Sequence, residues 1–339
     1  MVGRRAILQS AGVAAASAGI LATGTEAQAQ TRRRFNNPVK SRVLVLNDFA
    51  GDPDGLFALA QAVLQTSTDF RGAVGGLFTL PGAPTAADSA AKSSTAARRL
   101  LDIMGYQRTP VYTGSNTPLR DTRSPRVTDG ARAIVKEATR TDTTLPLFVT
   151  CGGSLTDVAS ALLMEPAIAK KFTLVWIGGA PHPAGGFEYN LSLDTAAGQV
   201  VFNESDVAIW QVTSAAYGQC LVSFAELELE LGQAGKVGNY LLDALDDFLV
   251  GLRKVITPGD AYSLGDSPLA LLTALYGFSP TGPTGGAGTF EQLKTPRLNA
   301  DMTYTPQANG RPIKVYEALD TRTMHGDLFA KLRLRYGKN

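Results

Sequence analysis

The chain has few of the side chains that build disulfides, zinc sites or cysteine–histidine catalytic pairs. Its 339 residues include two cysteines, two histidines and two tryptophans. Two cysteines exclude a disulfide framework, and four Cys and His residues in all argue against a zinc site. No GxSxG nucleophile elbow occurs either. The chemistry of this chain must therefore be sought among its oxygen-bearing side chains.

The chain also lacks a strong charge of either sign. Its 32 Lys and Arg nearly balance its 30 Asp and Glu, giving a net charge of +2. No basic patch is interleaved with aromatic residues, so nucleic acid and anionic membranes are not expected partners. An apolar content of 44% and a charged content of 18% fit a globular protein with a sizeable core.

The first residues are predicted to lie outside the fold. Arg4 and Arg5 precede an Ala/Gly-rich stretch, residues 11–22, which is too short to span a membrane. The sequence Ala-Gln-Ala at 27–29 fits a cleavage site, and GRRAILQ resembles a twin-arginine signal. Residues 1–29 are thus predicted to be a signal peptide, with a disordered basic tail as the alternative. The mature protein, residues 30–339, would be one domain without a membrane anchor, periplasmic or secreted.

Short apolar runs alternate with helical patterns from residue 42 to about 275. This alternation predicts an α/β fold, an open and mostly parallel sheet flanked by helices with a Rossmann-like core. The predicted strands are 43–46, 71–74, 110–112, 147–150, 173–177 and 208–212. The predicted helices are 56–65, 93–104, 131–137, 155–163, 195–202, 235–255 and 268–275. The Gly/Pro-rich segment 279–312 is predicted to be a long loop, either a lid or a covering hairpin, before a strand at 313–316 and a helix at 326–335.

Three acids follow the first predicted strand within seven positions: Asp48, Asp52 and Asp54. Ligands bind at the carboxyl ends of strands in open α/β sheets. Carboxylates that converge there repel one another unless a cation lies among them, and an all-oxygen set suits Ca²⁺ or Mg²⁺. The alternative is that these are solvated turn acids that cap a helix.

Three later segments also place polar groups at predicted strand ends. Glycines at the start of GGSLTD, from Gly152, let the backbone approach a ligand closely. Glu188 and Asn190 are a pairing typical of sugar-hydroxyl binding, and Asp194 is expected to be a helix N-cap. Asp266 precedes an apolar helix, either as its N-cap or as the last ligand of the acidic site.

Taken in this order, the segments resemble the inosine–uridine nucleoside hydrolase family over residues 42–275. NDFAGDPDGLFALA is similar to the family's DxDPGxDD segment, GGSLTD to TGxLTN, EYNLSLDTAAG to EFNxxxDPEAA and GDSPLA to HDPLA. The resemblance implies a calcium-dependent enzyme that hydrolyses the N-glycosidic bond of ribonucleosides and releases base and ribose. A small-molecule ribonucleoside is the implied partner, and a homo-oligomer is an open possibility.

The resemblance also implies roles for individual residues. Asp48 would bind Ca²⁺ and activate water as the catalytic base. Asp54, Asp266 and the carbonyl of Gly152 would complete the metal ligands. The substrate contacts on the ribose would come from Asp52, Glu188 and Asn190. The spacing of the acids leaves open whether Asp52 or Asp54 ligates the metal.

The group that faces the leaving base is the least defined part of the prediction. Gly265 stands where the family often has a histidine that protonates the base. His182 and His325 are candidate acids, and Trp210, Tyr189 and Tyr262 are among the candidates for stacking on the base. Because no acid is obvious, a non-enzymatic nucleoside or sugar binder is the main alternative. A glycosidase that uses two carboxylates without a metal is a third.

Overall fold

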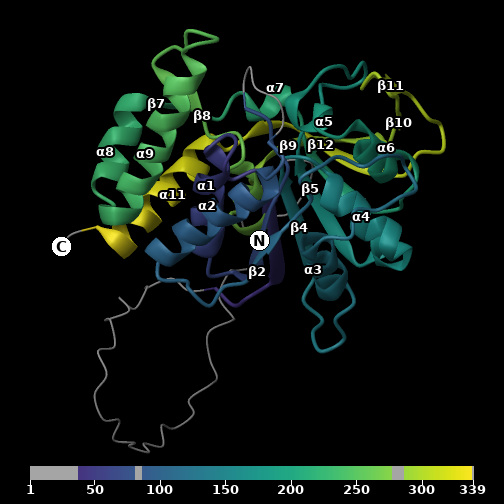
Figure 1. Ribbon diagram of the computed structural model, residues 1–339, viewed down its shortest axis with the longest axis horizontal. Coiled ribbons are helices and arrows are strands. Elements are labelled where there is room, and N and C mark those ends of the chain that lie inside the picture. Colours follow the sequence, from purple (N-terminus) through teal and green to yellow (C-terminus); the bar gives the residue numbers. More distant parts are fainter. Residues whose placement is uncertain (1–36, 81–85, 277–285, 338–339) are drawn as a thin grey trace, which may run out of the picture. The chain divides into compact units, whose positions relative to one another are not determined.

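The structure is a computed structural model that describes residues 37–80, 86–276 and 286–337 (Figure 1). The predicted signal peptide, residues 1–29, lies outside the described residues. Within the described ranges, no helix has both the length and the apolar character needed to cross a membrane.

The core of the fold is an eight-stranded sheet with the order β3-β2-β1-β4-β5-β6-β12-β9. Every pair of neighbours is parallel except β12 and β9, so the predicted mostly parallel α/β sheet is confirmed. The strand order reverses between β1 and β4, as in doubly wound folds, which bind ligands at this point. The strands are β1 (Ser41–Asn47), β2 (Thr68–Gly75), β3 (Val111–Thr113), β4 (Leu147–Gly152), β5 (Phe172–Ile177), β6 (Ala208–Val212), β9 (Gly288–Lys294) and β12 (Pro312–Leu319).

Helices cover both faces of the sheet because its central strands are apolar on both sides. In β1, Leu44 and Leu46 pack into one core cluster, and Val43 and Val45 pack into the other. The first face is covered by α3 (Asp129–Ala138), α4 (Thr156–Met164) and α6 (Thr195–Asn203). The second face is covered by α1 (Asp54–Val63), α2 (Ser89–Ile103), α8 (Phe224–Gly232), α9 (Gly235–Leu252), α10 (Pro268–Ala274) and α11 (Thr321–Tyr336). Figure 1 shows α8, α9 and α11 side by side and α4 with α6 across the sheet.

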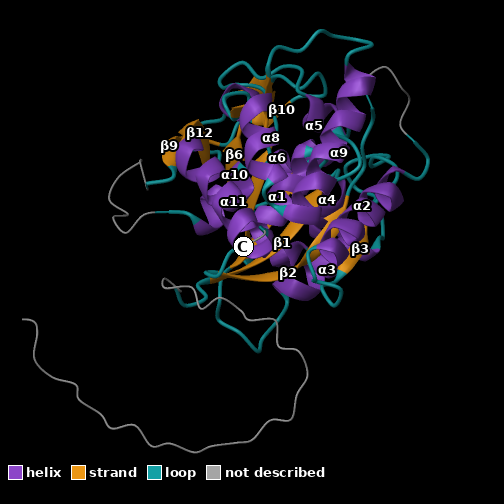
Figure 2. Cartoon of the chain, turned by 90° about the vertical axis from the view of Figure 1, so that its left-hand side faces the viewer, coloured by secondary structure: helices purple, strands orange, loops and turns teal. Residues whose placement is uncertain are grey.

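Short elements complete the described chain (Figure 2). They are η1 (Pro166–Lys170), α5 (Tyr189–Ser192), α7 (Ser214–Tyr217), β7 (Leu221–Ser223), β8 (Ala261–Ser263), β10 (Arg297–Leu298) and β11 (Tyr304–Thr305). Strands β7 and β8 pair antiparallel, as do β10 and β11.

Strands interrupt the predicted long loop at 279–312 within its described residues, and the longest of them is β9. Strand β9 pairs antiparallel with β12 and forms the edge of the main sheet. At its start, the partly buried Gly288 and Phe290 alternate with the exposed Thr289 and Glu291, a pattern typical of a half-buried edge strand. The glycines and prolines on either side obscured this pattern. Residues 277–285 lie outside the described residues.

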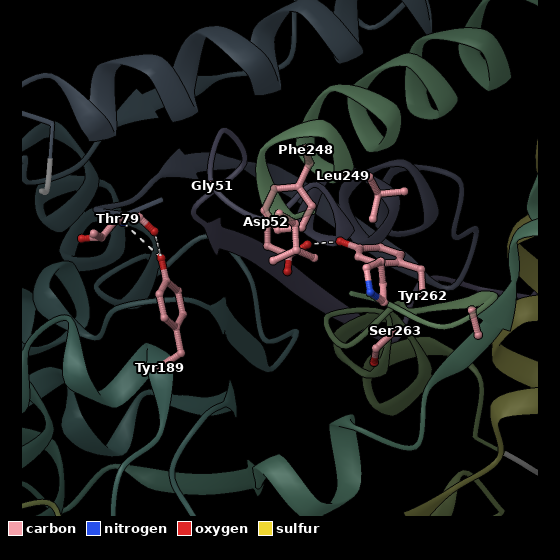
Figure 3. A pocket seen from close by; sticks show the side chains of 11 residues that line it. Gly51, Asp52, Thr79, Tyr189, Phe248, Leu249, Tyr262 and Ser263 are labelled. Atoms are coloured by element: carbon pink, nitrogen blue, oxygen red, sulfur yellow. Dashed lines mark hydrogen bonds between the residues drawn. The ribbon is translucent and has the colours of Figure 1, made fainter. Parts of the chain in front are cut away.

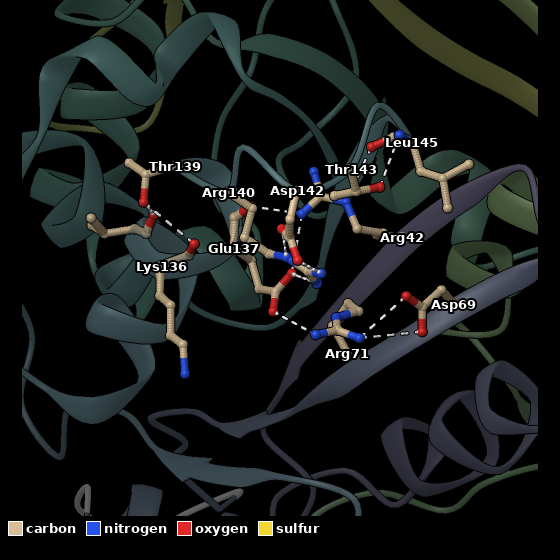
Figure 4. Close-up of polar contacts among 11 residues, drawn as sticks. Arg42, Asp69, Arg71, Lys136, Glu137, Thr139, Arg140, Asp142, Thr143 and Leu145 are labelled. Atoms are coloured by element: carbon tan, nitrogen blue, oxygen red, sulfur yellow. Dashed lines mark hydrogen bonds and ion pairs between the residues drawn. The ribbon is translucent and has the colours of Figure 1, made fainter.

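The amino edge of the sheet carries an ion-pair network centred on Glu137 (Figure 4). Arg42 Nη1 lies 3.1 Å from Glu137 Oε2, and Arg71 Nη2 lies 3.1 Å from Oε1. Arg140 Nη1 adds a third contact at 3.4 Å. Burial opposes the charge on Glu137, but hydrogen bonds and the charges of these arginines lower its pKa below the ordinary value. The network therefore stabilises a buried carboxylate by surrounding it with cations.

Candidate active site

The candidate site lies at the carboxyl ends of β1 and β4, where the strand order reverses. Strand β1 ends at Asn47, β4 ends at Gly152, and α1 begins at Asp54. Asn47 is buried, and its side chain organises the junction: Oδ1 accepts from the backbone N of Asp48 at 2.8 Å. The polar loops of both strands thus open into one crevice at the sheet edge.

Asp266 comes to this crevice from the far end of the chain. Its Oδ2 accepts a hydrogen bond from Asn47 Nδ2 at 2.8 Å, and its backbone N donates to Asp54 Oδ2 at 3.0 Å. Ser267, rather than Asp266, occupies the N-cap position of α10, and no side chain caps that helix. The structure thus disfavours the helix-cap interpretation of Asp266 and brings this residue together with the segment that follows β1.

Glycines let the backbone of β4 approach these acids closely. A Cβ added to Gly152 would lie 2.5 Å from both Asp266 Cγ and Asn47 Nδ2. The neighbouring Gly153 has more room, since its nearest atom, the backbone N of Asp48, would be 3.5 Å away. Only a residue without a side chain fits at Gly152, as a backbone contribution to the site requires.

Burial raises the pKa of each of the four carboxylates in the crevice, and repulsion by neighbouring carboxylates adds to the rise at Asp48, Asp54 and Asp266. Burial raises the pKa of Asp48 well above the ordinary value, and the negative charges of Asp266 and Asp52 raise it further. Burial followed by the same kind of repulsion raises the pKa of Asp54. The pKa of Asp52 is raised to about 6 and that of Asp266 to about 7, in both cases chiefly by burial. None of the ion pairs among the described residues involves these four acids, so the cluster lacks a compensating cation from the protein.

This donor set fits a hard divalent ion in its chemistry. Buried oxygen ligands that repel one another are the environment that Ca²⁺ stabilises. As the side chains stand, however, no group of three or more His, Cys, Asp or Glu residues in the described part of the chain is arranged to hold a metal ion. Asp266 Oδ2 accepts from Asn47, and Asp54 Oδ2 accepts from the Asp266 backbone. These two hydrogen bonds hold the carboxylates in their present arrangement.

Glu188 and Asn190 lie at the start of α5 and have structural partners. Glu188 is buried and caps α5 by accepting from the backbone N of Asn190 and of Leu191. It also accepts from Gly179 N at 2.7 Å and from the Tyr217 hydroxyl at 2.8 Å. Asn190 Nδ2 donates to the carbonyl of Ile177 at 2.9 Å. These bonds hold the loop after β5 in place, and a ribose-binding role for either residue stays a prediction.

A cavity of about 310 Å³ opens beside Asp52 (Figure 3). Apart from Asp52, it is lined by aromatic, aliphatic and small residues, among them Tyr189, Phe248 and Tyr262. The hydroxyl of Tyr262 donates to Asp52, as Figure 3 shows. Tyr189 and Tyr262, both predicted as stacking candidates, are therefore placed at the edge of the acidic crevice.

The other predicted leaving-group residues do not line this cavity. His182 Nε2 lies 2.9 Å from Gln211 Oε1, and the ring stacks on Tyr304 with centroids 4.5 Å apart. Trp210 is in the middle of β6 and packs on Phe148, with ring centroids 5.3 Å apart. The structure gives no support for either residue as a contact of the leaving group.

The remaining candidates are buried and do not line this cavity. His325 lies on α11 and lines a different cavity. Trp176, expected in the core, is fully buried, and Asp194 caps α6 as predicted by accepting from Ala197 N. Cys151 and Cys220 are both free and buried.

Two residues of the site were missed by sequence reasoning: Asn47 and Tyr217. A polar residue that ends an otherwise apolar strand was a usable signal for Asn47. Tyr217, on α7, could not have been linked to Glu188 without the fold, since they lie 29 positions apart on different elements.

The family model for inosine-uridine preferring nucleoside hydrolases matches residues 54–317, more than half of the chain. The chain belongs to this family. Its members are N-glycosyl hydrolases, which confirms the predicted enzyme class. The match includes Asp54, Gly152 and Asp266 but begins after Asp48 and Asp52.

Solved structures share the fold at low sequence identity. A plant nucleoside hydrolase is 19% identical, with a TM-score of 0.67, over 87% of this chain and 99% of its own. A purine-preferring ribonucleoside hydrolase from Gardnerella vaginalis is 18% identical, with a TM-score of 0.66, over 87% of this chain and 99% of its own. The inosine-uridine preferring nucleoside hydrolase from Bacillus anthracis is 16% identical, with a TM-score of 0.60, over 86% and 99%. No curated protein matches the sequence.

Proposed function

We propose that the protein hydrolyses the N-glycosidic bond of ribonucleosides with the help of a bound Ca²⁺. Membership of the nucleoside hydrolase family supports the reaction class. The observation that carries the rest is the meeting of Asp54 and Asp266 beside Asp48, because buried acids from distant segments gather at the ligand-binding edge of the sheet.

The metal ligands would be Asp48, Asp54, Asp266 and the carbonyl of Gly152. Their oxygens match the preference of Ca²⁺, and the cluster has no protein cation among the described residues to balance it. When bound, the ion would polarise a water molecule and favour the ionised forms of the carboxylates around it.

Asp48 would act as the catalytic base. It follows β1 directly, and its backbone is fixed by Asn47, so its carboxylate is presented from a rigid element. Accepting a proton from the attacking water is typically worth ~10²- to 10⁴-fold in rate. The surrounding negative charge, including that of Asp52, would stabilise the positive charge that develops on the ribose ring.

The ribose would be held by Asp52, Glu188 and Asn190. Glu188 and Asn190 are fixed by backbone hydrogen bonds, so any oxygen they offer to a sugar hydroxyl is preorganised. Asp52 lies between the acids and the cavity of Figure 3, where a contact to the sugar would leave the base directed into the cavity.

The test is ribose release from inosine, uridine, adenosine and cytidine by purified protein. We expect turnover with CaCl₂, loss of turnover with a chelator, and recovery when Ca²⁺ is restored. Calorimetric titration with the same nucleosides separates the main alternative, since a binding protein would show heat of binding without ribose release. Such a result, or equal turnover with and without chelator, contradicts the proposal.

We also propose export through residues 1–29. Fusion of residues 1–40 to a folded reporter, with an Arg4→Lys, Arg5→Lys double variant as the matched control, tests it. Periplasmic reporter is expected only with the native arginines and only in a host with a working twin-arginine translocase. Export that is unaffected by the double variant contradicts a twin-arginine signal.

A further inference from the structure

The cavity beside Asp52 has an unusual combination of lining groups for a pocket that receives a nucleobase. Tyr189, Phe248 and Tyr262 contribute aromatic rings, and Asp52 contributes the one carboxylate among its described lining residues. Phe248 and Tyr262 pack edge to face, with ring centroids 6.4 Å apart (Figure 3). The pocket can therefore stack on a flat ring and places a negative charge beside it.

Three of the four hydroxyl groups that line this cavity, those of Tyr189, Tyr262 and Ser263, direct their protons elsewhere. Tyr262 donates to Asp52, and Tyr189 donates to the carbonyl of Thr79. Ser263 Oγ donates to the carbonyl of Tyr217 at 2.9 Å. None of these three groups points its proton at the space that the leaving base would occupy.

The two histidines of the chain do not supply the missing acid either. His182 is held by Gln211 and Tyr304, and His325 lines a different cavity on α11. A Cβ at Gly265 would lie 3.2 Å from Asp54 Oδ2, so this position is close to the acids but has no side chain to offer. A neutral base that leaves as an anion would thus meet the negative charge of Asp52, and neither a histidine nor a tyrosine hydroxyl of the described residues is directed at it as a proton donor.

We propose that this site prefers ribosides whose leaving group is a cationic heteroaromatic ring, such as N-ribosyl pyridinium compounds and 7-methylpurine ribosides. The inference depends on the proposed function and names its substrate class. A cationic ring stacked on aromatic faces gains a cation–π attraction, and the carboxylate of Asp52 adds to it. The same features that disfavour an anionic leaving group favour a cationic one.

The chemistry of such substrates needs no general acid. The C1′–N bond breaks with its electron pair moving to the ring nitrogen, which cancels the positive charge and releases a neutral heterocycle. Water forms the new bond to C1′, and its proton passes to the carboxylate of Asp48. The products are ribose, the neutral heterocycle and one proton, so atoms and charge balance without a further reactant.

The first experiment compares 7-methylguanosine with guanosine, and nicotinamide riboside with inosine, on Ca²⁺-loaded protein. We expect kcat/KM to be at least about 100-fold higher for the cationic member of each pair, because a general acid that neutral bases lack here is typically worth ~10²-fold or more. A smaller ratio overturns the inference.

A third substrate separates this inference from the proposed function. 4-Nitrophenyl riboside has a leaving group that departs without protonation, so it reports on water activation and ribose binding alone. If it is cleaved while guanosine and 7-methylguanosine react alike, the function stands and the inference fails. If no riboside is cleaved, including the nitrophenyl compound, the proposed function itself fails.

A binding measurement tests the cavity without turnover. Titration of the protein with 1-methylnicotinamide, a cation, and with nicotinamide, its neutral counterpart, should show at least about five-fold tighter binding of the cation. Phe248→Leu should reduce that preference, and Val250→Ala, at an exposed position on the same helix, should not. Equal affinity for the two ligands in the native protein overturns the inference.

Discussion

The two edges of the same sheet treat buried acids in opposite ways. At the amino edge, Glu137 is surrounded by Arg42, Arg71 and Arg140, and its pKa is lowered. At the carboxyl edge, Asp48 and its neighbours have no ion-pair partner among the described residues, and their pKa values are raised.

A carboxylate that stabilises the fold thus differs from one that is available to bind a ligand. The amino edge is complete in the protein alone, since each oxygen of Glu137 has a cationic partner. The carboxyl edge holds repelling carboxylates in a fixed crevice, and this arrangement lowers stability unless a ligand compensates it. Stability is thus concentrated at one edge and binding capacity at the other.

The largest expected effect comes from replacing the proposed catalytic base, Asp48. Asp48→Asn should lower kcat for ribose release by ~10³-fold, within the range typical of general-base catalysis. The fold should persist, because the substitution removes one of several repelling charges. Steady-state kinetics and a thermal melt check both expectations. Retained turnover would remove Asp48 from its proposed role, and a collapsed fold would show that the two edges do not differ as described.

At the opposite edge, Glu137→Gln should destabilise the protein and leave turnover intact. Loss of the central charge leaves Arg42 and Arg71 without their shared carboxylate, which costs about 3 kcal/mol for a buried pair. Denaturant unfolding measures the loss, and Glu228→Gln, at an exposed position on α8, is the matched control. An unchanged midpoint would contradict the structural role of this network.

Removal of Ca²⁺ should make stability fall as pH rises. The pKa of Asp266 is raised to about 7 and that of Asp52 to about 6, whereas an ordinary Asp titrates near 4. At pH values between about 4 and these raised values, the folded state therefore binds more protons than the unfolded state. Stability from these groups is full at low pH and is lost as pH rises through the folded pKa. Melts in chelator should therefore show a higher Tm at pH 5 than at pH 8.

Ca²⁺ should reverse this trend, because it compensates the charges that repel at high pH. Saturation at about 100 times the dissociation constant stabilises by about 2.7 kcal/mol, and the gain should be larger at pH 8 than at pH 5. A Tm that is insensitive to Ca²⁺ at pH 8 would argue against a metal at this edge. The contribution of the amino edge to the pH dependence of stability has the opposite sign. Because the pKa of Glu137 is lowered, the stability that this group contributes is lost as pH falls.

The smallest effect concerns the glycine pair at the end of β4. Gly152→Ala should cost about 1–3 kcal/mol by overpacking and weaken Ca²⁺ binding, because the new methyl would lie 2.5 Å from Asp266 Cγ. Gly153→Ala is the control, since its Cβ would meet nothing closer than 3.5 Å. Calorimetric Ca²⁺ titration and unfolding midpoints compare them. Equal behaviour of the two variants would contradict the close approach at Gly152.

Much of the sheet could be predicted from sequence because its strands are buried on both faces and read as continuous apolar runs. The predicted strand at 173–177 corresponds to β5 and the predicted helix at 56–65 to α1. The structure of the ELELEL run at 226–231 was harder to predict, since its alternation of polar and apolar residues also fits a strand. The run forms helix α8, with Leu227 and Leu231 buried four residues apart and Leu229 exposed.

The candidate site could be predicted in its acids but not in its connections. The family resemblance associated Asp48 with Asp266, whereas the hydrogen bond of Asn47 to Asp266 depends on side-chain geometry that no pattern encodes. The cavity could not be predicted from the sequence for a similar reason. Its walls come from α9, β8 and the loop after β1, and only the tertiary fold brings Phe248 to Asp52.

The hydrogen bond between Asn47 and Asp266 joins residues 219 positions apart. The crevice consequently cannot be complete until residue 266 has been made and has docked at the end of β1, a contact of long sequence separation. Cation uptake during refolding should follow, and never precede, the docking of α10 on the sheet. Cation uptake measured with an ion-sensitive dye would then report when the final stage of folding takes place.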